Sequence, residues 1–171
     1  MTTGANSLER CYDGGVSANR SPDDSSGADA DVRVINGPNH VITLRDGYVH
    51  CRVFPRPDTD LASGARFAGN LVDTLIEMLE LPEDQVAYCV LNVCEAPGIA
   101  GPKTRAAVAR LAEVWEQARR PLLAVVGDEA IKDVQFHGLM TEHAPSHGRR
   151  VFTEEEAHAT ARRMMRRSIV G

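Results

Sequence analysis

Residues 101–104, Gly-Pro-Lys-Thr, place a lysine and a hydroxyl beside two turn-forming residues, a combination that invites comparison with phosphate-binding loops. A nucleotide-binding phosphate loop needs glycine directly before the lysine and a second glycine five residues earlier. Here Pro102 separates Gly101 from Lys103, and Ala96, five residues before Gly101, stands where the second glycine would be. The sequence therefore argues against nucleotide binding of this kind. A simpler anion site at a helix N-terminus, assisted by Lys103 and Arg105, stays open.

Two histidines, His143 and His147, are spaced four residues apart, as zinc ligands on one helix face are. Pro145 lies between them and the segment lacks helical patterning, so a solvated loop is the favoured interpretation. Cys94 ends an apolar run, where a packed cysteine is the default and a reactive thiol the alternative. The sequence shows no nucleophile elbow and no paired-carboxylate motif. We therefore predict no catalytic residue, no metal site, no cofactor and no enzymatic activity.

A strand, a loop and a helix must position these groups. Residues 86–93 are a nearly unbroken apolar run, which predicts a strand buried on both faces. The Pro/Gly-containing loop 95–101 follows. Gly101 as N-cap and Pro102 in the first turn then predict a helix that extends to about Arg119. In an open α/β sheet such a loop lies at the carboxyl end of a strand, where ligands usually bind. Loop 95–101 is therefore the predicted functional edge.

The rest of the chain predicts further strands and helices around this unit. Asp46-Gly47 between β-rich segments predicts a hairpin of residues 40–45 and 48–54, preceded by a short candidate strand at 32–35. Strand alternation places Val49, Cys51 and Val53 on the core face. A helix is expected over residues 61–79, with Thr59 or Asp60 as the cap. A second is expected from Asp128 to Met140, with Ile131, Val134 and Leu139 facing inward. The last follows a capping box at Thr153–Glu156. With strands at 122–126 and 149–152, the order β-β-α-β-α-β-α-β-α predicts an α/β fold with a mixed, mainly parallel sheet of five strands.

Composition and charge set the organisation of the chain. Of its 171 residues, 43% are hydrophobic, which is enough for one core. Residues 1–31 carry six acidic and two basic residues, so they hold −4 of the formal net charge of −5. Their Gly, Ser and Asp content predicts a disordered acidic tail, with the folded domain in residues 32–171. The formal net charge of −5 argues against bulk nucleic-acid binding. No apolar run approaches the length that spans a membrane, so stable membrane insertion is not expected. Cysteine usage and the lack of a secretory signal predict a cytoplasmic protein.

The expected last helix begins with glutamates and ends with arginines. Its four arginines, Arg162, Arg163, Arg166 and Arg167, fall on one arc at helical spacing. This polarity complements the helix dipole, which is the favoured interpretation. The alternative is contact with an anionic surface of a partner protein or a lipid.

Three segments are similar to STAS domains, the fold of bacterial anti-sigma factor antagonists, and to the short SpoIIAA-like proteins of that group. The segments are VLNVCEAPGIAGPKTRAAVARL, RRPLLAVVGDEAIKDVQ and GRRVFTEEEAHATARRM. The resemblance implies a single STAS-like domain with a regulatory role. The antagonists carry Asp-Ser-Ser-Gly in the loop after the central strand, with a phosphorylated serine, whereas residues 97–102 here contain no Ser, Thr or Asp. Thr104 is the nearest hydroxyl and the candidate phosphoacceptor.

We accordingly expect a non-enzymatic, STAS-like regulatory protein-interaction module in bacterial signalling. The expected interaction surface comprises Glu95, Pro97, Gly98, Gly101 and Lys103, beside the neighbouring third helix. The expected partner is a protein of unknown identity, and a homodimer is left open. The alternative is a small-molecule or lipid-binding protein of the same fold, with a pocket under the first helix.

Overall fold

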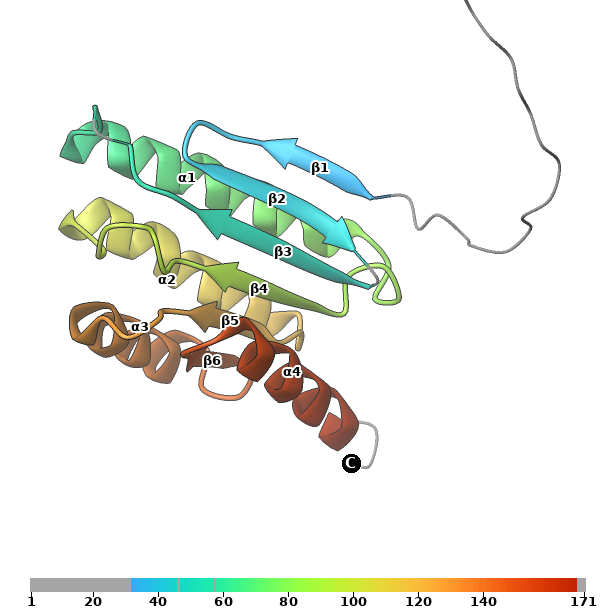
Figure 1. The fold of residues 1–171 in the computed structure, drawn as a ribbon. Helices are drawn as coiled ribbons and strands as arrows, with labels where there is room; N and C mark the ends of the chain where they lie inside the picture. The colour runs from blue at the N-terminus through green and yellow to red at the C-terminus, as the bar shows by residue number, and fades with distance from the viewer. Residues whose placement is uncertain (1–31, 46, 57, 169–171) are drawn as a thin grey trace, which may run out of the picture.

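The computed structural model describes residues 32–45, 47–56 and 58–168. This part of the chain forms a six-stranded sheet with four α-helices (Figure 1). The strands are β1 (Arg33–Asn36), β2 (His40–Arg45), β3 (Tyr48–Val53), β4 (Tyr88–Asn92), β5 (Leu122–Val125) and β6 (Gly148–Val151). The helices are α1 (Leu61–Glu77), with the short 3-10 helix η1 (Met78–Glu80) after it, α2 (Gly101–Gln117), α3 (Ala130–His143) and α4 (Glu154–Ser168). The tail expected over residues 1–31 lies outside the described residues.

The strands lie in the sheet in the order in which they occur along the chain. β1, β2 and β3 are antiparallel neighbours, and β3 to β6 are parallel neighbours. The predicted α/β class and mainly parallel mixed sheet are confirmed. The sheet has six strands where five were expected, because the short first segment pairs with β2 through Ile35 and Ile42. Gly47 has a φ of 81°, the left-handed conformation that the predicted hairpin turn requires.

The helices form layers on the two faces of the sheet. α1, α2 and α3 cover one face, where Trp115 and Phe136 pack with Cys51 and Leu91 of the central strands. α4 packs on the other face against β4, β5 and β6, around Val90, Leu123 and Ala161 (Figure 1). β4 and β5 are therefore covered on both sides, which explains their unbroken apolar sequence. Among the described residues, no helix is long and apolar enough to cross a membrane.

α3 differs from its prediction in the side that it buries. Ile131 and Val134 were expected inward, but they are 69% and 70% exposed. Leu139 is buried as expected, and it shares the buried side with Lys132, Phe136 and Met140. These positions follow the spacing of a helical stripe, but the stripe starts with a charged residue, so a hydrophobicity pattern alone selects the wrong face. The consequence is an apolar pair on the outer side of α3.

The starts of α1 and α4 are capped as predicted, whereas the N-caps of α2 and α3 differ from their predictions by one residue. Asp60 caps α1 by accepting a hydrogen bond from the Ser63 amide at 2.7 Å. α2 begins at Gly101, whose φ is 79°, and Ala100 is its N-cap without a side-chain cap. α3 likewise has Glu129 rather than Asp128 at its N-cap. The capping box of α4 forms, with the Thr153 hydroxyl accepting from the Glu156 amide at 3.1 Å.

Candidate functional site

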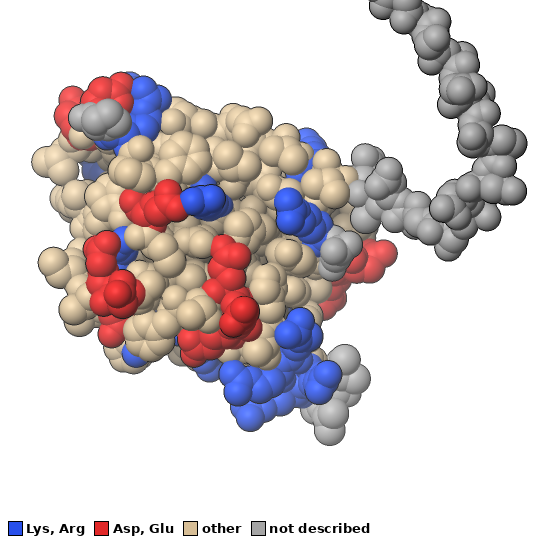
Figure 2. Space-filling view, in the orientation of Figure 1, with Lys and Arg blue, Asp and Glu red and all other residues tan. Residues whose placement is uncertain are grey.

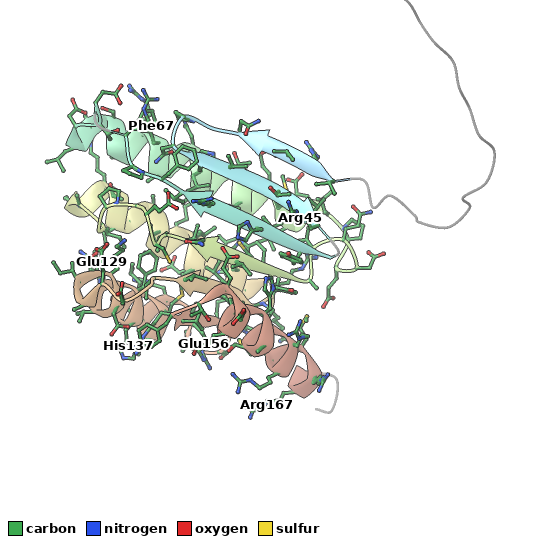
Figure 3. The ribbon with its side chains drawn as sticks, in the orientation of Figure 1. Arg45, Phe67, Glu129, His137, Glu156 and Arg167 are labelled. Atoms are coloured by element: carbon green, nitrogen blue, oxygen red, sulfur yellow. The ribbon has the colours of Figure 1, made fainter. Side chains whose placement is uncertain are left out.

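The carboxyl end of β4 is held by a buried lysine from α3. Lys132 is 1% exposed, and its ammonium donates to the carbonyl oxygens of Val93, at 3.1 Å, and of Cys94, at 2.5 Å. Its counter-charge is Glu129, whose Oε1 lies 2.9 Å from Nζ. Glu129 stands at the start of α3, next to this strand end (Figure 3). A buried charge is tolerated where it is paired and hydrogen-bonded, as here, so Lys132 fixes the point at which loop 95–101 leaves the sheet.

A second side chain of α3 fixes the middle of the loop. Gln135 accepts a hydrogen bond from the Ile99 amide at 2.9 Å and donates one to the Ile99 carbonyl at 3.1 Å. Gly98 lies against the same side chain, since a Cβ atom at this position would be 3.2 Å from Gln135 Oε1. The loop is thus pinned at both its start and its centre, which presets its shape.

The loop forms one wall of a pocket of about 560 Å³ between α1 and α2. Residues 96–100 supply this wall, and the rest is mostly apolar. The other apolar lining residues include Val53, Phe54, Leu61, Leu71, Val108 and Phe136. A pocket of this size and character is typical of small-molecule sites. A smaller hollow of about 300 Å³ lies between α3 and β6, but polar groups such as His137, Thr141 and Arg149 line much of it.

A few polar groups border the apolar pocket. Arg56 is paired with Asp58 at 2.7 Å, and its guanidinium carbon lies 5.5 Å from the ring centre of Phe67. Figure 3 labels Phe67 on α1. The pKa of Asp58 is lowered, chiefly by the hydrogen bond from Arg56. Thr59 Oγ1 is buried and has no hydrogen-bond partner among the described residues. Thr104, in the first turn of α2, brings another hydroxyl to the wall. These groups suit a ligand that is apolar along its length and polar at one end.

The structure separates the residues of the predicted surface into two groups. Pro97, Gly98 and the candidate phosphoacceptor Thr104 line the pocket. Glu95 instead forms an ion pair with Arg52 of β3, and both side chains are about half exposed. Gly101 and Lys103 are exposed at the start of α2, outside the pocket lining. The sequence could not reveal the contributions of Phe54 and Phe136, because each comes from an element that is distant in the chain.

A polar cluster missed by the sequence analysis lies on the opposite face of the sheet. Glu154 Oε1 accepts a hydrogen bond from Asn92 at 2.5 Å and lies 2.9 Å from His50 Nε2. Burial raises the pKa of Glu154, but the hydrogen bonds from Asn92 and His50 outweigh it, so the pKa of this carboxyl lies below its usual value. Strand alternation had placed His50 away from the core face, but it could not identify a partner 104 residues away.

Aromatic contacts continue this cluster along α4. Tyr48 and Tyr88 stack with ring centres 5.1 Å apart, and the Tyr88 hydroxyl lies 3.0 Å from His158 Nδ1. Burial, followed by the positive charge of Arg162, lowers the pKa of His158. The cluster therefore ties α4 to β3 and β4.

The alternative reactive groups occupy structural positions. His143 Nδ1 lies 2.8 Å from Glu113 Oε1, and His147 Nδ1 lies 3.4 Å from Glu116 Oε2, so each histidine pairs with α2. The described residues contain no group of three or more ligands that could hold a metal ion. Cys94 packs beside the α4 layer, and burial raises the pKa of its thiol, which favours the unreactive protonated form.

Comparison with family models, with curated proteins and with solved structures found no match for this chain. The likeness to STAS domains accordingly rests on the three sequence segments quoted above. The α/β architecture stands independently, on the strands and helices themselves.

Proposed function

We propose that this protein is a binding module that takes an apolar small molecule with one polar end into the pocket between α1, α2 and loop 95–101. The observation that carries this proposal is the pocket itself, with its volume of about 560 Å³ and its mostly apolar walls. Between the two functions expected from the sequence, it favours the small-molecule alternative.

The way the loop is fixed supports binding at this site. Lys132 and Gln135 hold the loop backbone through four hydrogen bonds, so little order has to be gained when a ligand enters. Transfer of each methylene group from water contributes about 0.8 kcal/mol. An alkyl chain of about eight carbons therefore gains roughly 6 kcal/mol, which exceeds the lower estimates of about 4 kcal/mol for the cost of association.

The polar border suggests how the ligand is oriented. The partnerless hydroxyl of Thr59 and the hydroxyl of Thr104 offer hydrogen bonds to a head group at the edge of the apolar lining. Arg56 adds a positive charge there, which a carboxylate or phosphate head group would share with Asp58. An alkyl carboxylate is therefore the simplest probe of the site.

The test is direct binding of dodecanoate to the full chain, measured by calorimetry below the concentration at which the probe forms micelles. Ala68→Trp fills the pocket from α1 and is expected to weaken binding at least tenfold. Ala106→Trp adds the same ring to an exposed position of α2 outside the lining and serves as the matched control. Equal affinity of the two variants would show that the probe binds elsewhere.

A second candidate function is protein docking at the same edge, the role expected from the STAS resemblance. Exposed apolar side chains flank the loop and favour protein docking. Leu61 is 68% exposed and Ile131 is 69% exposed. A Cβ atom at Gly98 would lie 3.6 Å from Ile131, and one at Gly101 would lie 3.9 Å from Leu61. Ile131→Glu and Val134→Glu are expected to abolish binding of a stoichiometric protein partner, or self-association of the protein. If docking and small-molecule binding are separate functions, the same variants leave dodecanoate binding intact.

A further inference from the structure

The C-terminal end of α4 carries a concentrated positive patch, formed by Arg162, Arg163, Arg166 and Arg167 and called here the arginine patch. All four residues are exposed. Figure 2 shows their charge gathered at one corner of the molecule, and Figure 3 places Arg167 at the free end of the helix. Within residues 32–45, 47–56 and 58–168, no acidic side chain forms a salt bridge with any of the four. Arg163 donates a hydrogen bond to the hydroxyl of Thr160 on the same helix.

The helix dipole accounts for part of this patch. Its influence falls off within the last turn of a helix, and α4 ends at Ser168. Arg166 and Arg167 lie in that turn, whereas Arg162 and Arg163 lie one turn earlier. The acidic residues of the helix, Glu154–Glu156, stand at its opposite end. Two of the four positive charges are thus compensated neither by the dipole nor by an ion pair with any carboxylate in the part of the chain that the structure describes.

The topology brings the start of the folded domain to the same end of the sheet. β1 is antiparallel to β2, and β2 is antiparallel to β3, so β1 runs in the direction of β3 to β6. β1 therefore starts at the amino end of the parallel strands. α4 follows β6 and returns across the sheet, so its last turn lies at this amino end as well (Figure 1).

The sequence that precedes β1 has the complementary charge. Residues 21–31, SPDDSSGADAD, contain four aspartates and no basic residue. Eleven residues span at most about 36 Å. Neighbouring strands are about 4.8 Å apart, so β1 lies about 19 Å from β5, the strand beneath α4. Asp23 and Asp24, nine and eight residues before Val32, are thus within reach of the arginine patch, whereas Asp29 and Asp31 stand closer to β1 and add to the negative charge of the connection.

We propose that residues 21–31 bind the arginine patch of α4 within the same chain. The attachment at Val32 keeps the aspartates at a high effective concentration near the arginines, which strengthens a contact that single exposed ion pairs would not sustain. The contact is electrostatic and exposed, so salt weakens it. The contact would keep other anions from binding the arginines. It would also hold the acidic segment at a defined site on the domain. This inference does not depend on ligand binding in the pocket.

The test is paramagnetic relaxation in the full chain, with a nitroxide attached at Ser26→Cys. Cys11→Ser and Cys94→Ser remove two of the four native thiols, while Cys51 and Cys89 are fully buried and stay unlabelled. The expected result is selective broadening of the amides of residues 162–167 at low salt. At 0.5 M salt, or after Asp→Asn substitution at residues 23, 24, 29 and 31, the broadening is expected to fall at least threefold.

A matched pair of charge variants makes the result specific. Arg166→Gln with Arg167→Gln removes two charges from the arginine patch and is expected to reduce the broadening. Lys103→Gln with Arg105→Gln removes two exposed charges from the opposite end of the sheet and is expected to leave it unchanged. Broadening elsewhere, or equal broadening in both variants, would overturn the proposal. A second outcome would also overturn it: the full chain binds anionic-lipid vesicles or nucleic acid through the arginines, and the α4 amides show no broadening. The partner of the arginine patch would then be an external molecule. Amide spectra confirm that each variant is folded.

Discussion

Gln135 of α3 makes both of its amide hydrogen bonds to one residue, Ile99, accepting from its backbone N–H and donating to its carbonyl. This paired contact supplies hydrogen bonds to the backbone of loop 95–101, as a neighbouring strand supplies them to the backbone of an edge strand. It satisfies the backbone polar groups of a residue that is half-buried beside an apolar pocket. The shape of the pocket wall therefore depends on α3, although α3 contributes little more than Phe136 to the lining.

Gln135→Ala removes both hydrogen bonds and leaves the backbone groups of Ile99 without partners. We expect the free energy of unfolding to fall by about 1–3 kcal/mol, the usual cost of unsatisfied buried groups. Urea unfolding can be followed by the fluorescence of Trp115, the single tryptophan, which is fully buried. The Ile99 amide should also exchange with deuterium faster. Gln117→Ala, at an exposed position of α2, is the control and should leave both quantities unchanged.

Lys132→Met keeps most of the side-chain volume but removes the charge that binds the carbonyl groups of Val93 and Cys94. Two acceptors then lose their donor inside the protein, and we expect a loss of about 2–4 kcal/mol in unfolding free energy. Lys103→Met, at an exposed position, should change it by less than about 0.5 kcal/mol. Equal stability of the two variants in urea would mean that Lys132 does not hold the strand end.

We expect the contact that His158 makes between α4 and the sheet to weaken at acidic pH. Burial lowers its pKa in the folded state, so the unfolded chain, with an ordinary pKa of about 6.5, binds the proton more readily. The stability that neutral His158 provides is complete above about pH 6.5 and is lost as the pH falls through that value towards the lower folded pKa. Burial also lowers the pKa of His40. His40 therefore changes the unfolding free energy with pH in the same direction.

His158→Phe keeps a ring against Tyr48 and removes the titration. Between about pH 7 and pH 5.5, we expect its unfolding free energy to depend less steeply on pH than that of the wild type. Thr141→Ala, at an exposed position of α3, removes no titratable group and should keep the wild-type slope. Urea titrations at four or five pH values decide the matter, and an unchanged slope in His158→Phe would contradict the assignment.

The sequence predicted the architecture well because its signals are local. The hairpin glycine, the apolar run before loop 95–101 and the capping box at Thr153 each fix a short segment, and their order implies a mainly parallel sheet. For α3 the sequence identified Leu139 as buried but wrongly placed Ile131 and Val134 inward, because Lys132 occupies a core position that hydrophobicity excludes. Its burial is understandable once the carbonyl oxygens of Val93 and Cys94 are seen beside it.

The candidate site was predicted in part. Pro97 and Gly98 were selected from loop chemistry, and both line the pocket. The remaining walls come from Asn39, from residues between 53 and 71, from Thr104 and Val108 of α2 and from Phe136, which only the folded chain brings together around the loop. The same limit applies to Glu154 and His50, which are 104 residues apart in the sequence. Long-range pairings of this kind leave no periodic signal in a single sequence.

The most direct test of the binding proposal is the dependence of affinity on ligand length, measured by calorimetry with straight-chain carboxylates of six to twelve carbons. If the chain enters the apolar pocket, each added methylene group should contribute up to about 0.8 kcal/mol, or nearly fourfold in affinity, until the pocket is filled. Ala68→Trp should shorten the optimal chain or abolish binding, whereas Ala106→Trp should reproduce the wild-type series. An affinity that does not change with chain length, or the same series in both variants, would contradict the account.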